Sequence, residues 1–360
     1  GIKPMGSDNL QRAGEYLYQV MAEICDQVEI HQYQVPCWEV KDWRLEDQNG
    51  KEIKSYLFLE SGSSEKFEGY VEFAGYHRVW DMYVWRRYKI VDAEGRICAY
   101  ITVRENEGAI PQMLFAKSDL PHFMVGSKEE AILKEAEKSR ALLRGFAETK
   151  INKSGYCRNL SGEIGEGREK VILCAHYDTV YSTVGAYDNA AGTAVVLETA
   201  RQLTQYGLNK KIEILLTDGE EFNLKGARFR AAEERGDISF VLNIDGVGRE
   251  DILEVWCGPE TFERKVRAVL DKSKEKFIPR YICPPPPGSD HAPFYEKGIP
   301  VCMLTFNDQG ILHTPEDIIE KSKLRNMEKM VRLNLELLER IGVIQRDTNY
   351  PSLMHITLTE

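Results

Sequence analysis

The stretch that decides the fold is Val171-Ile172-Leu173-Cys174-Ala175-His176-Tyr177-Asp178, an apolar run that ends in a histidine and an aspartate. A short, continuous apolar run predicts a strand that is buried on both faces of a sheet. The polar residues at its end matter, because ligands in open parallel sheets collect at the carboxyl ends of the strands. We therefore expect His176 and Asp178 to lie at the edge of a crevice.

The same alternation continues along the chain. Further apolar runs at 212–216, 240–244, 252–256 and 301–306 alternate with helical patterns at 190–206, 227–234, 261–274 and 321–341. A strand followed by a helix, repeated, predicts an α/β three-layer sandwich with a mostly parallel central sheet. Another helix is predicted over residues 8–28, where apolar residues share one face.

The composition of residues 36–125 differs from that of the rest of the chain and predicts a second domain. Short β-rich runs alternate there with Gly and Asp or Asn turns, and aromatic residues are concentrated. Residues 128–146 are charged and rich in Ala and Leu, which predicts a helix leading back to the main domain. We expect a main domain of residues 1–35 plus 126–360 and an inserted, smaller β-rich domain of residues 36–125.

Composition excludes some classes of function. The formal net charge is −10 over 360 residues, which argues against nucleic acid as a partner, because phosphate binding needs a basic surface. No apolar stretch has transmembrane length, and no secretory signal is visible. The eight cysteines are scattered, which favours buried thiols in a reducing compartment over a disulfide such as Cys283 to Cys302. We expect a cytoplasmic rather than a secreted protein, and a homo-oligomer is compatible with the sequence.

Acidic residues or histidine follow the other apolar runs too. These residues are Glu220 and Glu221, then Asp245, then His313, while Asp188 stands just before a helical pattern. With the histidine of the first strand, they give two imidazoles and several carboxylates at one edge of the predicted sheet. Zinc accepts imidazole nitrogen and carboxylate oxygen, so the sequence predicts a two-metal site.

Each of these residues also has an ordinary structural explanation. Asp188 can cap a helix, a Glu-Glu pair is common in surface turns, and residues 314–317 have the composition of a helix start. Asp178 is expected beside the metal rather than on it, because a carboxylate can accept the second N–H of a ligand histidine. Their shared position at strand ends favours the metal site over several separate explanations.

These motifs resemble those of the co-catalytic zinc aminopeptidases of the bacterial leucyl aminopeptidase and aminopeptidase Y type. Glutamate carboxypeptidases and glutaminyl cyclases belong to the same superfamily. The resemblance covers about residues 155–341. It rests on Ala175-His176-Tyr177-Asp178, Tyr187-Asp188-Asn189-Ala190-Ala191-Gly192, Asp218-Gly219-Glu220-Glu221, Asn243-Ile244-Asp245, Ser289-Asp290-His291 and His313-Thr314-Pro315-Glu316-Asp317.

The resemblance implies a ligand set for two Zn²⁺ ions. Asp188 would bridge the ions, His176 and Asp245 would complete one site, and Glu221 and His313 would complete the other.

The resemblance also implies the catalytic roles. Glu220 would be the general base and Asp178 would orient His176. The activity implied is that of a metallo-exopeptidase, a hydrolase that removes N-terminal residues from peptides with a free N-terminus by means of a metal-bound hydroxide. A cis peptide bond is expected between Asp188 and Asn189.

Substrate-binding residues are expected at Tyr187, Tyr281, Asp290 and His291. Several relatives place a tyrosine three residues before the Ser-Asp-His motif, but Pro286 stands there in this chain, and Tyr281 is the nearby substitute. The inserted β-rich region occupies the position where many relatives hold a protease-associated domain.

Three other functions compete with an aminopeptidase. A carboxypeptidase would need basic residues for a C-terminal carboxylate, and Arg280 and Lys297 lie near the motifs. A glutaminyl cyclase-like enzyme would use a single zinc ion. A non-catalytic binding relative would have lost ligands or the base, whereas this chain keeps five ligand positions and Glu220.

Overall fold

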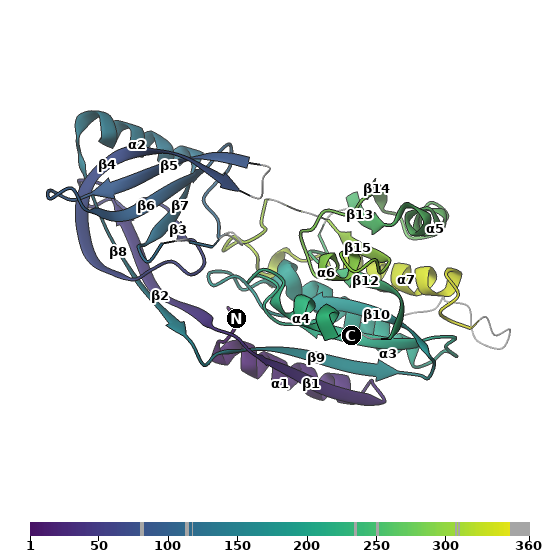
Figure 1. Ribbon diagram of the computed structural model, residues 1–360. Helices are drawn as coiled ribbons and strands as arrows, with labels where there is room; N and C mark the ends of the chain where they lie inside the picture. Colours follow the sequence, from purple (N-terminus) through teal and green to yellow (C-terminus); the bar gives the residue numbers. More distant parts are fainter. Residues whose placement is uncertain are drawn as a thin grey trace. The chain divides into compact units, whose positions relative to one another are not determined.

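The computed structural model describes residues 1–79, 83–111, 115–116, 118–233, 236–249, 252–306, 308 and 310–345. The chain forms two compact units (Figure 1). The first combines Gly1–Gln34 with the chain from Tyr156 onward, and the second is Val35–Gly155.

The first unit is built on an eight-stranded sheet whose order is β1-β9-β11-β10-β12-β15-β13-β14. The four strands β11, β10, β12 and β15 are parallel, whereas β9 runs antiparallel to both of its neighbours, β11 and β1, and β13 is antiparallel to β15 but parallel to β14. The predicted α/β fold with a parallel central sheet is therefore confirmed, with antiparallel strands toward its edges. The strand bounds are β1 Gln27–Gln34, β9 Tyr156–Ile164, β10 Glu169–His176, β11 Lys211–Thr217, β12 Asp237–Ile244, β13 Ile252–Gly258, β14 Ile278–Ile282 and β15 Val301–Thr305.

Helices cover both faces of this sheet because successive strand residues point to opposite faces. In β10, Leu173 and Ala175 join the core that contains residues of α1, α3, α5 and α7, whereas Ile172 and Cys174 join a core with α4 and α6. The three layers are thus two helical layers around one sheet. The helix bounds are α1 Asp8–Ala22, α3 Ala191–Leu203, α4 Lys225–Glu233, α5 Glu260–Leu270, α6 Ala292–Tyr295 and α7 Leu324–Arg340.

The second unit is a seven-stranded sheet with the order β2-β8-β4-β5-β6-β7-β3 and one helix, α2 Ser127–Ser139. Its strands are mostly antiparallel, and β6 and β7 are parallel. Their bounds are β2 Cys37–Glu46, β3 Tyr56–Leu57, β4 Ser64–Val79, β5 Tyr83–Val91, β6 Ile97–Arg104, β7 His122–Gly126 and β8 Leu142–Asn152.

The boundary of the second unit differs from the expected one. It extends to Gly155 rather than to residue 125, because β8 pairs antiparallel with both β2 and β4. The helix predicted over residues 128–146 ends at Ser139, and β8 begins at Leu142. Leu143 and Ala147 are buried within a two-residue repeat, a strand pattern that the helical composition just before it obscured.

Two further features concern the whole described chain. No helix among the described residues is long and apolar enough to cross a membrane. All eight cysteines are free, and Cys302 lies opposite Cys257 on neighbouring strands rather than beside Cys283.

Candidate metal centre

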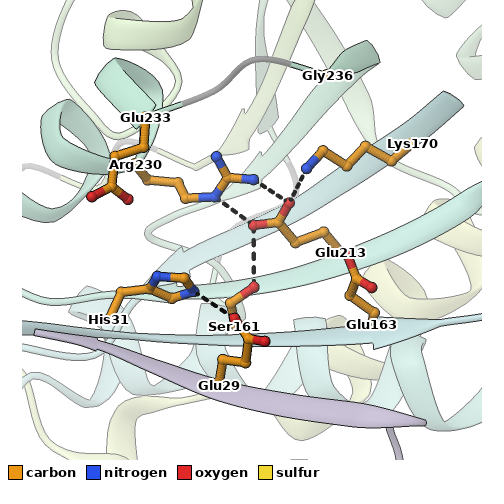
Figure 2. Close-up of a pocket in the computed structure, with 9 residues that line it drawn as sticks. All are labelled: Glu29, His31, Ser161, Glu163, Lys170, Glu213, Arg230, Glu233 and Gly236. Carbon is orange, nitrogen blue, oxygen red and sulfur yellow. Dashed lines mark hydrogen bonds and ion pairs between the residues drawn. The ribbon is translucent and has the colours of Figure 1, made fainter. Parts of the chain in front are cut away.

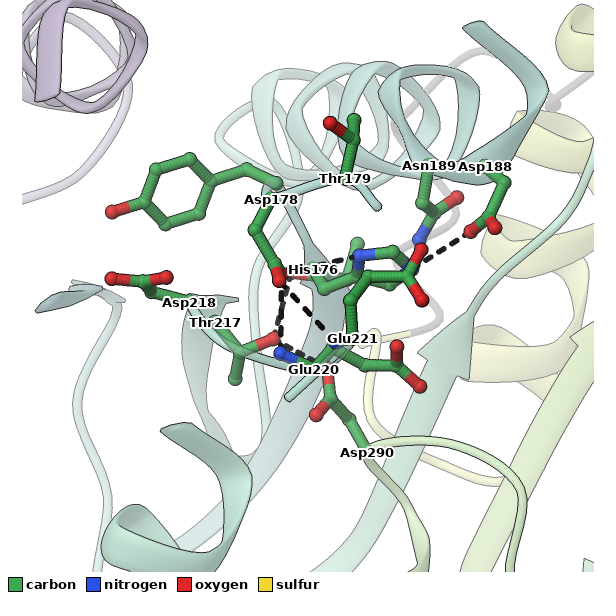
Figure 3. A network of polar contacts seen from close by, with 12 residues as sticks. His176, Asp178, Thr179, Asp188, Asn189, Thr217, Asp218, Glu220, Glu221 and Asp290 are labelled. Carbon is green, nitrogen blue, oxygen red and sulfur yellow. Dashed lines mark hydrogen bonds and ion pairs between the residues drawn. The ribbon is translucent and has the colours of Figure 1, made fainter. Parts of the chain in front are cut away.

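Four parallel strands bring the predicted site residues to one edge of the first sheet. His176 is the last residue of β10 and pairs in register with Thr217 at the end of β11. Glu220 and Glu221 follow β11 through a short turn, and Asp245 directly follows β12. The loop after β15 carries the second histidine, at position 313. Figure 3 shows the side chains from β10 and β11 converging with those from the turn before α3.

Asp188 lies in a kinked turn, Ala186–Ala190, that leads into α3; its φ of −121° and ψ of 88° are not helical, and the predicted cis peptide bond to Asn189 is present. Asn189 fixes this turn: its Nδ2 donates to the Ile244 carbonyl at 2.9 Å, and its Oδ1 accepts from the Gly192 amide at 3.0 Å. A Cβ at Gly192 would lie 2.1 Å from Asn189 Oδ1, so the close approach requires glycine. The turn is therefore tied to the end of β12.

Two clusters of metal-ligand atoms share Asp188. His176 Nε2 lies 3.1 Å from Asp188 Oδ1 and 3.2 Å from Asp245 Oδ1. His313 Nε2 lies 3.1 Å from Asp188 Oδ2 and 3.2 Å from Glu221 Oε2. Within each cluster the three donor atoms lie within 4.8 Å of one another. Asp188 thus presents one oxygen to each cluster, which is the geometry of a bridging carboxylate.

The contacts among these residues leave hydrogen-bonding groups unsatisfied, and a divalent cation in each cluster would satisfy them. Each histidine has one Nε2 atom between two carboxylates, so a single N–H cannot satisfy both. Neither oxygen of Glu221 makes a well-formed hydrogen bond, although Oε2 is close to His313. Buried carboxylates without partners are costly, and a cation within each cluster would neutralise them. The imidazole and carboxylate donors are those that zinc accepts.

The electrostatics without a cation point in the same direction. Burial alone would lower the pKa of His176, but Asp245 and Glu220 raise it well above its ordinary value. Burial would likewise raise the pKa of Asp188, but the two histidines hold it well below its usual range. Burial raises the pKa of Glu221 to about 7, against the opposing effect of His313. The carboxylates therefore favour positive charge at the histidines, as they would favour a bound cation.

Asp178 lies beside His176 and beside the turn that carries the two glutamates. Its Oδ1 lies 3.4 Å from His176 Nδ1, the nitrogen that faces away from the other carboxylates. Its two oxygens also accept from the amides of Glu220 at 3.2 Å and Glu221 at 3.3 Å. One carboxylate therefore fixes both the histidine ring and the turn that carries the two glutamates (Figure 3).

Glu220 is buried at this site but belongs to neither cluster. Burial raises the pKa of the Glu220 carboxyl well above its usual range; His176 opposes this shift, and Glu221 and Asp245 add to it. A carboxyl group with a raised pKa beside a metal site can exchange protons near neutral pH.

Comparison with known proteins agrees with this geometry. A sequence profile described as Peptidase family M28 matches residues 159–338, which is half of the chain. The chain belongs to peptidase family M28. The matched segment contains both clusters and Glu220.

Several known proteins are similar to this M28 chain. Aminopeptidase YwaD of Bacillus subtilis is 31% identical over 166 residues, which are 42% of this chain and 36% of that protein. The chain thus spans about a third of the length of this curated relative. An aminopeptidase from Aneurinibacillus sp. strain AM-1 has the same fold, with a TM-score of 0.72 at 16% identity over 98% of this chain and 93% of that chain. So does a zinc aminopeptidase from Bacillus subtilis, with a TM-score of 0.70 at 19% identity over 97% and 93%.

The two tyrosines expected to bind substrate in the M28 chain have other contacts. Tyr187 is buried, and its hydroxyl accepts from the Asp308 amide at 2.9 Å. Tyr281 lies on the edge strand β14; its hydroxyl donates to Asp271 at 2.7 Å, and Arg267 stacks over its ring at 3.9 Å. Neither placement supports a direct contact with substrate. Proximity to the motifs suggested both roles; Tyr187 lies in the turn beside Asp188, and Tyr281 lies on the edge strand β14.

The Ser-Asp-His segment supports the site rather than facing solvent, since Asp290 and His291 are fully buried. Thr217 donates its hydroxyl hydrogen to Asp290. Ser289, to which the sequence assigned no role of its own, donates to Asp245 Oδ2 at 2.6 Å. Through Ser289, the segment therefore fixes the carboxylate of the candidate metal ligand Asp245.

Two other contacts at the site were not predicted. The Lys3 amide donates to Thr179 Oγ1 at 2.8 Å, and the Thr179 amide donates back to the Lys3 carbonyl at 3.1 Å. Asp317, expected within a helix start, instead accepts from the amides of Tyr187 and Asp188. No sequence signal distinguishes Lys3, whereas the motif ending at Asp317 marked that residue without indicating its partners.

A hollow of about 400 Å³ lies elsewhere in the first unit, beside β9 to β11 and α4 (Figure 2). Glu213 is buried in its wall and accepts from Arg230 at 2.7 Å and 2.6 Å, with Lys170 3.1 Å away. Arg230 and Lys170 compensate the charge of Glu213, and none of the predicted site residues lines the hollow. The carboxylate clusters at the strand ends therefore remain the candidate site.

Proposed function

We propose that this M28 chain is a zinc-dependent aminopeptidase that hydrolyses the first peptide bond of substrates with a free N-terminus. The observation that carries the proposal is the pair of ligand clusters that share Asp188, buried except for the half-buried His313, with Glu220 beside them. The names of the similar proteins, aminopeptidases from Bacillus subtilis and Aneurinibacillus, support the same activity.

The proposal assigns two Zn²⁺ ions to the two clusters. His176, Asp188 and Asp245 would hold one ion, and Asp188 with Glu221 and His313 would hold the other. Zinc, when bound, supplies a Lewis acid that polarises a peptide carbonyl and lowers the pKa of water.

Glu220 is proposed as the general base. Its raised pKa suits a group that takes a proton from the attacking water and later gives it to the leaving amine. Asp178 fixes the main chain of Glu220 through the 3.2 Å amide hydrogen bond, so the carboxylate would be held in place during both transfers.

Selection of N-termini is proposed to come from the density of carboxylates. Asp188, Glu220, Glu221 and Asp245 gather in one buried region, and this negative charge would attract an α-ammonium group.

Of the two basic residues that left a carboxypeptidase open, Arg280 and Lys297, Arg280 on β14 is engaged elsewhere and lies 3.2 Å from Glu254. A single-zinc cyclase is not favoured either, because both clusters have three donors.

The test is hydrolysis of dipeptides and aminoacyl-amides by zinc-loaded protein, with each substrate offered free and N-acetylated. We expect cleavage of the free forms alone, with loss of activity on chelation and in Glu220→Gln. Glu316→Gln is the matched control, because it makes the same change at an exposed glutamate that pairs with Lys321. Cleavage of the acetylated forms, or full activity in Glu220→Gln, would contradict the proposal.

A further inference from the structure

Asp317 joins two of the three loops that carry the ligands of the second cluster, those of Asp188 and His313. It lies in the segment that follows His313, and its side chain is completely buried. The Tyr187 amide donates to Asp317 Oδ1 at 2.5 Å, and the Asp188 amide donates to Asp317 Oδ2 at 3.1 Å. The carboxylate of Asp317 therefore binds the main chain at the shared ligand Asp188 through two hydrogen bonds.

A second contact ties the same two loops. Thr183 Oγ1 donates to the Thr314 carbonyl at 2.9 Å, so it links the chain before Asp188 to the residue after His313. Through these contacts the separation of Asp188 and His313 is set by side chains that are not themselves metal ligands.

Capping of a helix does not explain Asp317. The short 3₁₀ turn nearby is Ile319–Lys321, and its N-cap residue is Ile318. The next α-helix, α7, begins at Leu324 with Lys323 as its N-cap. Both oxygens of Asp317 are instead used by amides from a segment more than 120 residues earlier in the chain. Such a long-range contact with a ligand-bearing turn indicates a role in shaping that turn.

We propose that Asp317 is a positioning residue that sets the distance between Asp188 and His313 and so determines how tightly the second cluster binds zinc. This inference rests on the proposed function for the identity of the metal. A carboxylate is needed because it offers two acceptors, whereas an asparagine would turn an N–H group toward one of the two amides.

The test is zinc binding by the whole chain, measured by equilibrium dialysis against chelator-buffered zinc, in wild type, Asp317→Asn and Glu316→Gln. Wild type is expected to bind two ions. Asp317→Asn is expected to weaken the second ion by about 10- to 100-fold, the range typical of residues that hold metal ligands in place, and to weaken the first ion less. Glu316→Gln changes the neighbouring, exposed carboxylate in the same way and is expected to bind like wild type.

The outcomes separate this inference from the function on which it rests. If wild type does not bind two zinc ions, the proposed function fails. If wild type binds two and Asp317→Asn binds both with unchanged affinity, the positioning role is overturned and the proposed function stands. If Asp317→Asn does not fold, Asp317→Ser decides, because a hydroxyl removes one of the two acceptors without turning an N–H group toward an amide. Unchanged affinity of the second ion in that variant would also overturn the inference.

Discussion

Replacing Asp178 with asparagine is predicted to weaken zinc binding without changing any proposed ligand. Asp178 accepts from the amides of Glu220 and Glu221 at 3.2 Å and 3.3 Å and lies 3.4 Å from His176 Nδ1. Asparagine has the same shape but only one oxygen, so one of these contacts must be lost. The variant therefore tests whether the orientation of His176 and of the glutamate turn matters to the metal.

The size of the effect follows from the bond that is lost. A hydrogen bond to a charged group contributes about 1.5–3 kcal/mol. If all of this falls on the metal-bound form, the zinc dissociation constant rises about 10- to 100-fold, since about 1.4 kcal/mol corresponds to a factor of ten. Activity at limiting zinc should fall in parallel and recover in part at high zinc.

The assay is competition for zinc with a chelator of known affinity, with kcat/KM measured at each free zinc concentration. Asp237→Asn is the matched control, because Asp237 is exposed and pairs with Arg168 at the start of β12. Wild-type zinc affinity in Asp178→Asn would refute the reasoning, as would an equal loss in Asp237→Asn.

Three other predictions concern the ligands, the effect of pH and the second unit. Zinc content measured by mass spectrometry should fall from two ions to none in Asp188→Asn but only to one in His313→Ala, because only Asp188 belongs to both clusters. An equal loss of zinc in the two variants would contradict a bridging role for Asp188. Zinc affinity should weaken as pH falls, because protons compete with the metal for the two histidines. The nearby carboxylates raise the pKa of both histidines, against the effect of burial, and so favour the competing protons. A zinc dissociation constant that does not change between pH 8 and 5 would exclude this competition. Burial lowers the pKa of His122 in the second unit to about 3, below the unfolded value of about 6.5. As the pH falls below 6.5, the unfolded chain binds a proton at His122 that the folded chain does not bind. The free energy of unfolding therefore decreases as the pH drops from 6.5 toward 3, and at pH 4.5 the decrease is about 3 kcal/mol. His122→Gln should remove most of this acid sensitivity in urea unfolding, and an unchanged pH profile would show that His122 is not its cause.

The parallel centre of the fold and the convergence of the ligands could be predicted from the sequence. Short apolar runs such as residues 171–175, too short for a typical helix, favour buried strands, and parallel strands place the residues that follow them at one edge. This argument needs no knowledge of side-chain contacts, which is why it placed His176, Asp245 and the Glu220-Glu221 turn together.

Other parts of the fold depend on contacts that a single sequence does not reveal. β9 was not predicted because its interior includes Asn159 and Ser161, polar residues that are buried through specific partners. Asn159 donates to the Gly226 carbonyl at 2.9 Å, and Ser161 donates to Glu213 at 3.2 Å. The pairing of β8 with β2, far away in the chain, likewise decided the boundary of the second unit.

The residues around the ligands show the same contrast between what the sequence predicts and what depends on tertiary contacts. The motif that contains Tyr187 placed it near the site, but the burial of its ring and its bond to Asp308 are tertiary facts. Asp317 carried the composition of a helix start, and only the folded chain shows that its carboxylate accepts from amides of a distant turn. Local composition thus identified where chemistry is concentrated, but not which side chains support it.

The central claim is tested most directly by following, by mass spectrometry, which end of a five-residue peptide is shortened by the zinc-loaded chain. The account predicts stepwise loss of residues from the N-terminus, abolished by N-acetylation of the peptide and by removal of zinc. Shortening from the C-terminus, or a peptide left intact under conditions in which two zinc ions are bound, would contradict it.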